Sequence, residues 1–255
     1  DIEQATGFPV IGELMYEKLS NPIVTMNAER SFIQEQFRQI RGSLKHQGNP
    51  KGNIKRILVT SSVKGEGKSF VSSNLAISLA RSGKKVALLE MDLHQPKLRE
   101  MLDIEPSAGI TDYLIGEVEA DQIRMQTTIH PNLHLIPSGT MVDEPSELLV
   151  NGRLEQLLNY LDTKYDVLMI DTAPLLALSD ASVIAPNVNL ILYIVRHNHT
   201  PKGHIEMLDE NMRSYQLENV AIVFNGVKTR GFSKKGYGYG YGYGNDAKSN
   251  YDGYM

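Results

Sequence analysis

The stretch Ile57-Leu58-Val59-Thr60-Ser61-Ser62-Val63-Lys64-Gly65-Glu66-Gly67-Lys68-Ser69 decides the fold of this 255-residue chain. It begins as a short apolar run, continues as a glycine-rich loop and leads into a helical pattern that reaches about residue 82. A Gly-Lys-Ser sequence between a strand and a helix is the usual context of a phosphate-binding P-loop. The alternative is a glycine turn that caps an ordinary strand-helix unit, and the matching flanks favour the phosphate site.

The loop offers each kind of group that binds a nucleotide polyphosphate. Gly65 and Gly67 let backbone N–H groups converge on phosphate oxygens, and the following helix adds the positive end of its dipole. Lys68 is predicted to reach the β- and γ-phosphates, and the Ser69 hydroxyl to bind Mg²⁺. Ser62 stands at the usual first-glycine position. The predicted cofactors are ATP and Mg²⁺, and the predicted nucleotide-binding residues are Ser62, Val63, Lys64, Gly65, Glu66, Gly67, Lys68, Ser69, Phe70 and, at the end of a later strand, Asn225.

Two aspartates follow apolar runs elsewhere in the chain. Asp171 ends the run at residues 167–171, as the acidic residue of a Walker B strand does, and would hold Mg²⁺ directly or through water. Asp92 follows the run at residues 86–90 and would contact the same metal, or orient and deprotonate an incoming hydroxyl. The alternatives are a helix cap or turn residue for Asp171 and a solvated turn carboxylate for Asp92. The predicted catalytic residues are Lys68, Asp92 and Asp171, and the predicted metal ligands are Ser69, Asp92 and Asp171.

Short apolar runs alternate with helical stretches along most of the chain. The runs are continuous, which is the expectation for parallel strands covered on both faces. We therefore predict an α/β fold with a doubly wound, mostly parallel sheet of the P-loop NTPase type, similar to the partitioning ATPases. Strands are expected at residues 57–60, 86–90, 133–136, 167–171, 190–195 and 220–225, and helices at 27–45, 68–82, 145–161 and after Pro201.

The composition divides the chain into three parts. Residues 1–26, punctuated by glycine and proline, are predicted to be an irregular lead-in segment, and residues 27–230 the P-loop domain. Residues 231–255 are predicted to be a flexible, disordered tail, because a Gly-Tyr repeat has too few aliphatic side chains to bury a core. The alternative is a low-complexity linker or adhesive segment. The tail holds six of the twelve tyrosines of the chain: Tyr237, Tyr239, Tyr241, Tyr243, Tyr251 and Tyr254.

The composition also limits the setting and the partners. The absence of cysteine excludes disulfides, thiolate metal sites and a cysteine nucleophile, and fits a reducing, cytoplasmic compartment. The formal net charge of -4 argues against a generally basic nucleic-acid binder, so no nucleic-acid partner is expected. No apolar run approaches the roughly 20 residues that a membrane-spanning helix needs. The chain opens without Met or a signal-peptide pattern, which is consistent with a piece cut from a longer protein that has a membrane part.

Together these segments resemble the bacterial tyrosine kinases, the cytoplasmic catalytic domains of polysaccharide co-polymerase proteins, over almost the full length of the chain. Residues 61–69 resemble the Walker A motif of that family, Glu90-Met91-Asp92 its Walker A′ motif, and Ile170-Asp171-Thr172-Ala173-Pro174 its Walker B motif. Further matches are Gly109-Ile110-Thr111-Asp112-Tyr113-Leu114, Pro145-Ser146-Glu147-Leu148-Leu149 and the terminal tyrosine cluster. The sequence departs from the family at Glu90 and His94, because the usual A′ pattern is Asp-x-Asp-x-Arg.

The resemblance implies an ATP-dependent protein-tyrosine kinase that autophosphorylates the six tail tyrosines, in trans within a ring homo-oligomer such as an octamer. It also implies a role in capsule or exopolysaccharide synthesis and export, a transmembrane polysaccharide co-polymerase segment or partner, and a cognate tyrosine phosphatase. The implied location is cytoplasmic, at the inner face of the bacterial cell membrane. Val63 stands where the partitioning ATPases carry a signature lysine, which favours the kinase. The alternatives are a partitioning-type ATPase switch and a catalytically weak nucleotide-binding scaffold.

The family also carries an E-x-x-R-x-x-R motif on an early helix that holds the ring together. Here the motif is Glu35, Arg38 and Arg41. On a helical wheel these three residues point away from the apolar stripe that faces their own core, so they are predicted oligomer contacts. The alternative is a solvated i, i+3 ion pair that stabilises only the helix.

Overall fold

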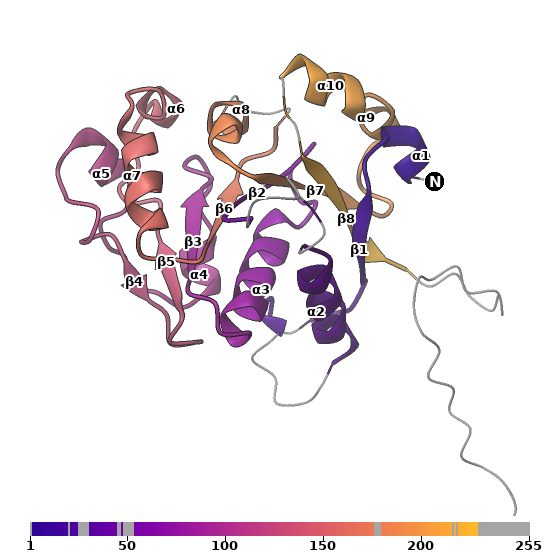
Figure 1. Ribbon diagram of the computed structural model, residues 1–255, viewed down its shortest axis with the longest axis horizontal. Helices are drawn as coiled ribbons and strands as arrows, with labels where there is room; N and C mark the ends of the chain where they lie inside the picture. The colour runs from indigo at the N-terminus through magenta and orange to yellow at the C-terminus, as the bar shows by residue number, and fades with distance from the viewer. Residues whose placement is uncertain are drawn as a thin grey trace, which may run out of the picture.

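The computed structural model describes residues 2–19, 21–24, 31–44, 47, 54–175, 180–215, 217 and 219–228. One sheet runs through these residues and carries helices on both faces (Figure 1). The predicted tail, residues 231–255, and its six tyrosines lie outside the described residues.

The sheet has the strand order β1-β8-β7-β2-β6-β3-β5-β4. Neighbouring strands are parallel except at one edge, where β4 pairs antiparallel with β5. The predicted strands are all present, each with ends within two residues of the prediction, so the α/β doubly wound fold is confirmed. The strands are β1 (Val10–Met15), β2 (Arg56–Ser61), β3 (Val86–Met91), β4 (Met125–Gln126), β5 (Leu133–Ile136), β6 (Val167–Thr172), β7 (Leu190–Arg196) and β8 (Val220–Val227).

The helices connect these strands in the crossover manner of a parallel sheet. The helix predicted after Pro201 is present as two short helices separated at Met207. The helices are α1 (Ile2–Thr6), α2 (Phe32–Leu44), α3 (Lys68–Arg81), α4 (Leu98–Met101), α5 (Ile110–Ile115), α6 (Pro145–Leu148), α7 (Arg153–Asp162), α8 (Asp180–Ile184), η2 (Ala185–Asn187, a 3₁₀ helix), α9 (Lys202–Glu206) and α10 (Leu208–Ser214).

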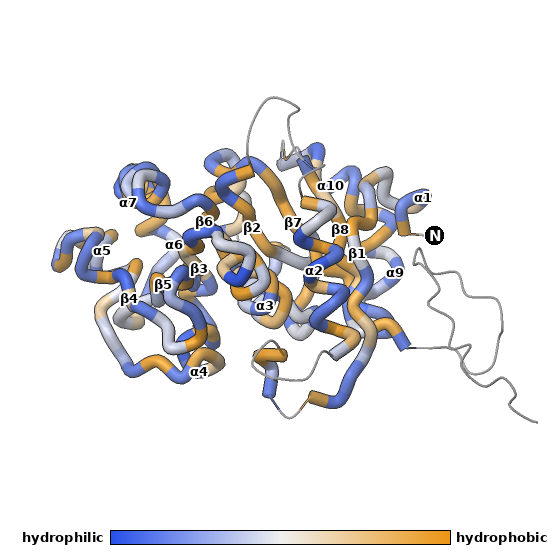
Figure 2. The backbone as a smooth tube through the Cα atoms, turned by 60° about the horizontal axis from the view of Figure 1, so that its bottom comes forward, coloured by the Kyte–Doolittle hydropathy of each residue, from blue (hydrophilic) through white to orange (hydrophobic). Residues whose placement is uncertain are grey.

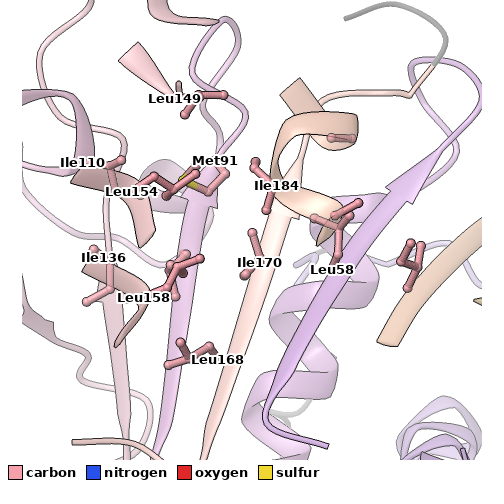
Figure 3. Close-up of a cluster of buried hydrophobic side chains, with 14 of the residues drawn as sticks. Leu58, Met91, Ile110, Ile136, Leu149, Leu154, Leu158, Leu168, Ile170 and Ile184 are labelled. Carbon is pink, nitrogen blue, oxygen red and sulfur yellow. The ribbon is translucent and has the colours of Figure 1, made fainter. Parts of the chain in front are cut away.

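Two hydrophobic clusters cover the two faces of the sheet. In β3, Ala87 and Leu89 belong to one cluster, with α5, α7, α8 and α10, whereas Val86 and Leu88 belong to the other, with α2, α3 and α4. Successive strand residues therefore alternate between two buried faces, which is why the central strands are apolar throughout. Figure 2 shows hydrophobic colour along the central strands and mixed colour along the helices. Figure 3 shows part of the first cluster, where side chains of α7 and α8 lie against those of β2, β3 and β6.

The prediction of an irregular lead-in segment is wrong for residues 2–6 and 10–15, which form α1 and β1. Residues 10–15 form β1, which pairs in parallel with β8 at the edge of the same sheet. Gly12 allows close contact between this strand and α2, because a Cβ at Gly12 would collide with the side chain of Ile40. The first described part of the chain therefore belongs to the fold of the P-loop domain.

The prediction of one helix at residues 145–161 is also wrong. The segment forms α6 and α7, separated by residues 149–152. Gly152 precedes α7 with φ 79°, a left-handed conformation that interrupts a continuous helix. None of the helices in the described ranges is both long and apolar enough to span a membrane.

Candidate functional site

A pocket of about 270 Å³ opens at the carboxyl ends of the parallel strands β2, β3 and β6. This edge is where sheets of this type bind their ligands. Seven residues predicted from the sequence line it: Lys64, Gly65, Gly67, Lys68, Ser69, Phe70 and Asp92. Five further residues complete the wall, and the sequence did not single them out as ligands: His94, Gln95, Lys97, Ala173 and Pro174.

The P-loop joins β2 to α3, and its shape depends on two glycines. Gly65 has φ 88° and Gly67 has φ 101°, both in the left-handed region that side-chain-bearing residues rarely adopt. Gly67 directly precedes Lys68, the first residue of α3. The helix therefore begins at the pocket, where its unpaired N–H groups and positive dipole end suit an anion.

The loop backbone is held by side chains that follow or belong to β7 and β8. Arg196 Nη1 donates to the Gly65 carbonyl at 2.5 Å, and His199 Nε2 lies 2.9 Å from the Lys64 carbonyl oxygen. Asn225 Nδ2 donates to the Glu66 carbonyl at 2.8 Å. Asn225 was predicted to bind the nucleotide, but it supports the loop from behind and does not line the pocket.

Glu66, Ser62 and Val63 form a second layer behind the pocket surface. The Glu66 side chain is fully buried, and its carboxylate accepts hydrogen bonds from Ser62 Oγ at 3.0 Å and from the Val63 N–H at 2.7 Å. It also accepts from the Thr200 hydroxyl. The Glu66 carboxylate, the Ser62 hydroxyl and the Val63 N–H therefore stabilise the shape of the loop, although all three residues were predicted to bind the nucleotide.

Lys68 is buried where the P-loop enters α3, and its side chain lines the pocket. Its Nζ lies 3.3 Å from Ser61 Oγ. Burial lowers the pKa of the ammonium group, and the nearby carboxylates of Asp171, Asp92 and Glu66 partly offset that shift. The fold thus brings all three predicted catalytic residues into one electrostatic cluster.

Asp171 is fully buried near the carboxyl end of β6, beside the P-loop helix. Burial raises the pKa of its carboxyl group to about 7, although hydrogen bonds with Ser69 and Ser72 and the charge of Lys68 act in the opposite direction. Its Oδ1 has no hydrogen-bond partner among the described residues. A buried carboxylate with a spare oxygen beside Ser69 fits Mg²⁺, which proteins usually hold with one or two carboxylates and the phosphates of the substrate.

Asp92 lines the pocket directly after β3, the strand that pairs with the Asp171 strand β6. Burial raises the pKa of its carboxyl group, while a hydrogen bond from the Gln95 N–H at 3.0 Å and the charge of Lys68 lower it in part. A half-buried carboxylate in the pocket can bind a metal ion, or orient and deprotonate an incoming hydroxyl group.

Glu90 resembles the first acidic residue of the A′ motif, but it is absent from the pocket wall described above. Its fully buried carboxylate accepts hydrogen bonds from the Leu98 N–H at 2.5 Å and the Arg99 N–H at 3.3 Å, at the start of α4. Its other oxygen accepts from the Ser138 N–H at 3.2 Å, after β5. Glu90 therefore fixes the backbone around the pocket. The glutamate that replaces the usual aspartate of the family is a supporting residue and does not line the pocket.

His94, the second departure, takes part in a contact that the sequence did not reveal. Its Nε2 lies 3.3 Å from Ser146 Oγ in α6 and 3.4 Å from Asp180 Oδ2 at the start of α8. The Ser146 hydroxyl donates to Asp180 Oδ1 at 2.5 Å. Ser146 lies in the family match at residues 145–149, whereas Asp180 belongs to none of the motifs found in the sequence.

The predicted oligomer contacts divide into two groups. Glu35 and Arg38 are exposed on α2 and form an ion pair at 2.7 Å, which is the i, i+3 pair named above as the alternative. The prediction that all three residues point away from the core is wrong for Arg41. Its Nη1 donates to the Ser78 carbonyl in α3 at 2.6 Å, because the long side chain crosses from α2 to the neighbouring helix.

Comparison with known proteins agrees with this site. The family model described as AAA domain matches residues 54–219, which is more than half of the chain. The chain is 27% identical over 220 residues to the tyrosine-protein kinase YwqD of Bacillus subtilis, which covers 86% of this chain and 92% of YwqD. Several other curated relatives are longer, and the chain spans only 25–32% of their length.

Solved structures share the fold. The kinase domain of the Escherichia coli tyrosine kinase ETK matches with a TM-score of 0.82 and 25% identity, covering 94% of this chain and 98% of that domain. The septum site-determining protein MinD of Pyrococcus horikoshii, solved with Mg-ADP, matches with a TM-score of 0.55 and 21% identity over 66% of this chain and 67% of MinD, a likeness of fold alone. With the P-loop, the two strand-end aspartates and these matches in place, the chain belongs to the AAA-domain family and is a relative of the bacterial tyrosine kinases.

Proposed function

We propose that this chain is an ATP- and Mg²⁺-dependent protein-tyrosine kinase domain that phosphorylates its own C-terminal tyrosines. The observation that carries the proposal is the convergence of Lys68, Asp92 and Asp171 around one P-loop pocket. The proposed acceptors are Tyr237, Tyr239, Tyr241, Tyr243, Tyr251 and Tyr254. Kinship with tyrosine kinases supports this assignment over a partitioning-type ATPase switch.

In this proposal the nucleotide is bound mainly by the P-loop. The N–H groups at the start of α3 and the Lys68 ammonium group hold the phosphates, and Phe70 lines the same pocket. Ser69, Asp171 and Asp92 would hold Mg²⁺, which neutralises charge on the phosphate oxygens during transfer. The side chains that support the P-loop keep its N–H groups and Lys68 in place before the nucleotide binds, so little reorganisation is needed.

The proposed reaction is an in-line transfer of the γ-phosphoryl group to a tyrosine hydroxyl. The bond between the γ-phosphorus and the β,γ-bridging oxygen breaks, a bond from the γ-phosphorus to the phenol oxygen forms, and ADP leaves. Lys68 stabilises the negative charge on the transferring group. Asp92, which lines the pocket, orients the phenol and accepts its proton, directly or through water.

The tail is proposed to react in trans within a ring of subunits. β8 ends at Val227, at the same edge of the sheet as the pocket, and only two strand spacings, roughly 10 Å, separate β8 from β2. The exposed Glu35–Arg38 pair is available for a subunit contact. We further propose an octamer-like ring, a polysaccharide co-polymerase partner at the inner face of the cell membrane, a cognate tyrosine phosphatase, and a role in capsule or exopolysaccharide export.

Mass spectrometry of the tail tests the kinase proposal. The full chain is incubated with ATP and Mg²⁺, beside Lys68→Met as the control. We expect phosphate on several of the six tyrosines of the parent, and a rate lower by about 10²-fold or more in Lys68→Met. ATP hydrolysis without tyrosine phosphorylation would instead favour the partitioning-type ATPase, and a parent tail without phosphate contradicts the proposal.

Phosphorylation is also proposed to open the ring. Each phosphotyrosine adds about -1.5 to -2 charges, so several in one short tail repel one another strongly. Light scattering should then give a smaller particle for the phosphorylated chain than for the unphosphorylated one. Equal masses for the two forms would remove this part of the proposal.

A further inference from the structure

The contact between His94, Ser146 and Asp180 lies beside the pocket and plays no part in the mechanism described so far. The three side chains are connected in series: His94 Nε2 lies 3.3 Å from Ser146 Oγ, and the Ser146 hydroxyl donates to Asp180 Oδ1. A second path joins its ends directly, because Asp180 Oδ2 lies 3.4 Å from His94 Nε2. We call these three residues the A′ latch.

Asp180 gives the A′ latch its strength. Its side chain is fully buried, and its Oδ2 makes no hydrogen bond with the described residues. A buried carboxylate is costly unless donors reach it, so the positions of Ser146 and His94 are coupled to the burial of Asp180. His94 is about one-third exposed, which leaves its other face at the pocket.

The A′ latch ties together segments that follow three adjacent strands. His94 follows β3, Ser146 lies in the first helix after β5, and Asp180 begins the first helix after β6. These strands are neighbours in the order β6-β3-β5, and their carboxyl ends form one edge of the sheet. Of the three residues, only His94 lines the pocket, two positions after Asp92.

We propose that Ser146 and Asp180 are positioning residues that act through His94 to hold Asp92 in place for Mg²⁺ and the acceptor hydroxyl. The inference rests on the proposed nucleotide role of the pocket. The P-loop wall has its own supports in Arg196, His199 and Asn225, so the A′ latch should not affect binding of the phosphates alone. It should affect the part of binding that depends on the metal.

Titration of a fluorescent ADP analogue, with and without Mg²⁺, separates these two parts. The variants are His94→Ala, Ser146→Ala and Asp180→Asn, each checked for folding by its melting temperature. We expect Ser146→Ala and Asp180→Asn to bind the nucleotide without Mg²⁺ within about twofold of the parent. The gain in affinity on adding Mg²⁺ should fall by about tenfold or more in all three variants. The matched control is His130→Ala, a half-buried histidine at the amino end of β5, on the opposite edge of the sheet.

Two further variants distinguish a latch from a general loss of packing. The double variant His94→Ala, Asp180→Asn should be no worse than the more severe single variant, because both remove the same connection. His94→Arg should keep the Mg²⁺ effect, because a guanidinium group donates well to a carboxylate, and it should lose that effect when combined with Asp180→Asn.

Several results would overturn the inference. One is a gain in affinity on adding Mg²⁺ that is as large in His94→Ala as in the parent. Another is a double variant whose loss of this gain equals the product of the losses in the two single variants. If Asp180→Asn does not fold, His94→Ala and Ser146→Ala decide the question, because both side chains are only partly buried. A parent chain that binds no nucleotide overturns the proposed function and the latch together, whereas a parent that binds with Mg²⁺ beside unchanged variants overturns the latch alone.

Discussion

The two walls of the pocket are held in different ways. On the P-loop wall, Arg196, His199 and Asn225 contact backbone carbonyl oxygens, and the buried Glu66 carboxylate binds the loop from within. On the A′ wall, the buried Glu90 carboxylate also binds backbone N–H groups, but the support nearest the pocket joins side chain to side chain, through His94, Ser146 and Asp180.

The difference follows from what each wall presents to a ligand. The P-loop wall offers backbone N–H groups, so its supports must fix the course of the backbone. The A′ wall offers the carboxylate of Asp92, so its supports must fix the place of one side chain. Asp171 lies between the two walls, because its strand β6 is flanked by β2, which leads into the P-loop, and by β3, which leads to Asp92.

Asp171→Asn should have the largest effect. Removing the charge beside Ser69 should lower phosphotransfer by about 10²- to 10³-fold, because the metal site loses a buried carboxylate. The same change should raise the melting temperature of the nucleotide-free protein at pH 8 by about 2–4 °C, because it removes a buried charge that Lys68, Ser69 and Ser72 compensate only in part. Activity assays and thermal melts measure the two effects, and a destabilised variant at pH 8 would contradict this account.

The pH dependence gives the control for Asp171→Asn. The folded-state pKa, about 7, lies above the ordinary value of 3.8, so the folded state binds more protons in this window and the carboxyl group costs stability as the pH rises through it. The parent should therefore lose stability relative to Asp171→Asn between about pH 4 and pH 7. Parallel pH profiles for the two proteins would show that this carboxyl group is not shifted.

Glu66→Ala should break the P-loop wall. The change leaves the Val63 N–H and the hydroxyls of Ser62 and Thr200 without their acceptor, so the free energy of unfolding should fall by about 2–4 kcal/mol. Nucleotide affinity should fall even without Mg²⁺, unlike in the A′ latch variants. Denaturant unfolding and nucleotide titration measure both effects, and Glu66→Gln, which keeps an acceptor, is the matched control. If Glu66→Ala lowered nucleotide affinity only in the presence of Mg²⁺, the proposed difference between the P-loop wall and the A′ wall would be wrong.

Thr200→Val should show a smaller effect on the same wall. The Thr200 hydroxyl donates to Glu66 and accepts from the Arg196 N–H at 2.8 Å, so its loss should cost about 1–2 kcal/mol of unfolding free energy. In the presence of Glu66→Ala, the same substitution should cost clearly less, because the two residues share a contact. Additive costs in this double-mutant cycle would place Thr200 outside the support of the loop.

Asp112→Asn should have the smallest effect and tests the backing of the A′ wall. The Asp112 carboxylate accepts from the Gly109 N–H at 2.7 Å and the Thr140 N–H at 3.1 Å, between α5 and the segment that leads to α6. Burial alone would raise the pKa of this carboxyl group, but these hydrogen bonds outweigh it and lower the pKa below 3.8. We expect Asp112→Asn to cost about 1 kcal/mol of unfolding free energy at pH 7.

The sign of the shift at Asp112 sets its pH test. A depressed folded-state pKa contributes stability that is present above pH 3.8 and is lost as the pH falls through the folded value. The gap between parent and Asp112→Asn should therefore close in acid, as chemical unfolding at pH 7 and below pH 3.8 can measure. A difference in unfolding free energy that grows in acid would contradict the lowered pKa of Asp112.

The sequence predicted the centre of the sheet well and its margins poorly. Residues 167–170 and 190–195 are continuous apolar runs, and a strand buried on both faces produces this pattern. β1 contains Gly12 and Glu13, and among the described strands it pairs with β8 alone, more than 200 residues away, so no local pattern marks it. A signal carried by a distant partner is invisible to periodicity.

The same division holds in the site. Lys68, Ser69 and Asp171 were predicted because their chemistry depends on a local strand-loop-helix or strand-end context. The partners of His94 lie 52 and 86 residues away in the chain, and nothing near Asp180 resembles a binding motif. Arg41 shows the converse error, because the helical wheel of α2 contains no information about α3, which receives its side chain.

The contact between Gly67 and Asn225 has a consequence for how this protein can evolve. Gly67 is constrained twice, because its φ of 101° disfavours any side chain and because a Cβ there would meet Asn225 Nδ2. Asn225 is constrained once, by its hydrogen bond to the Glu66 carbonyl. The two constraints are therefore unequal: a change at Asn225 removes one support of the loop, whereas a side chain at position 67 stays strained by its positive φ even after Asn225 has been replaced.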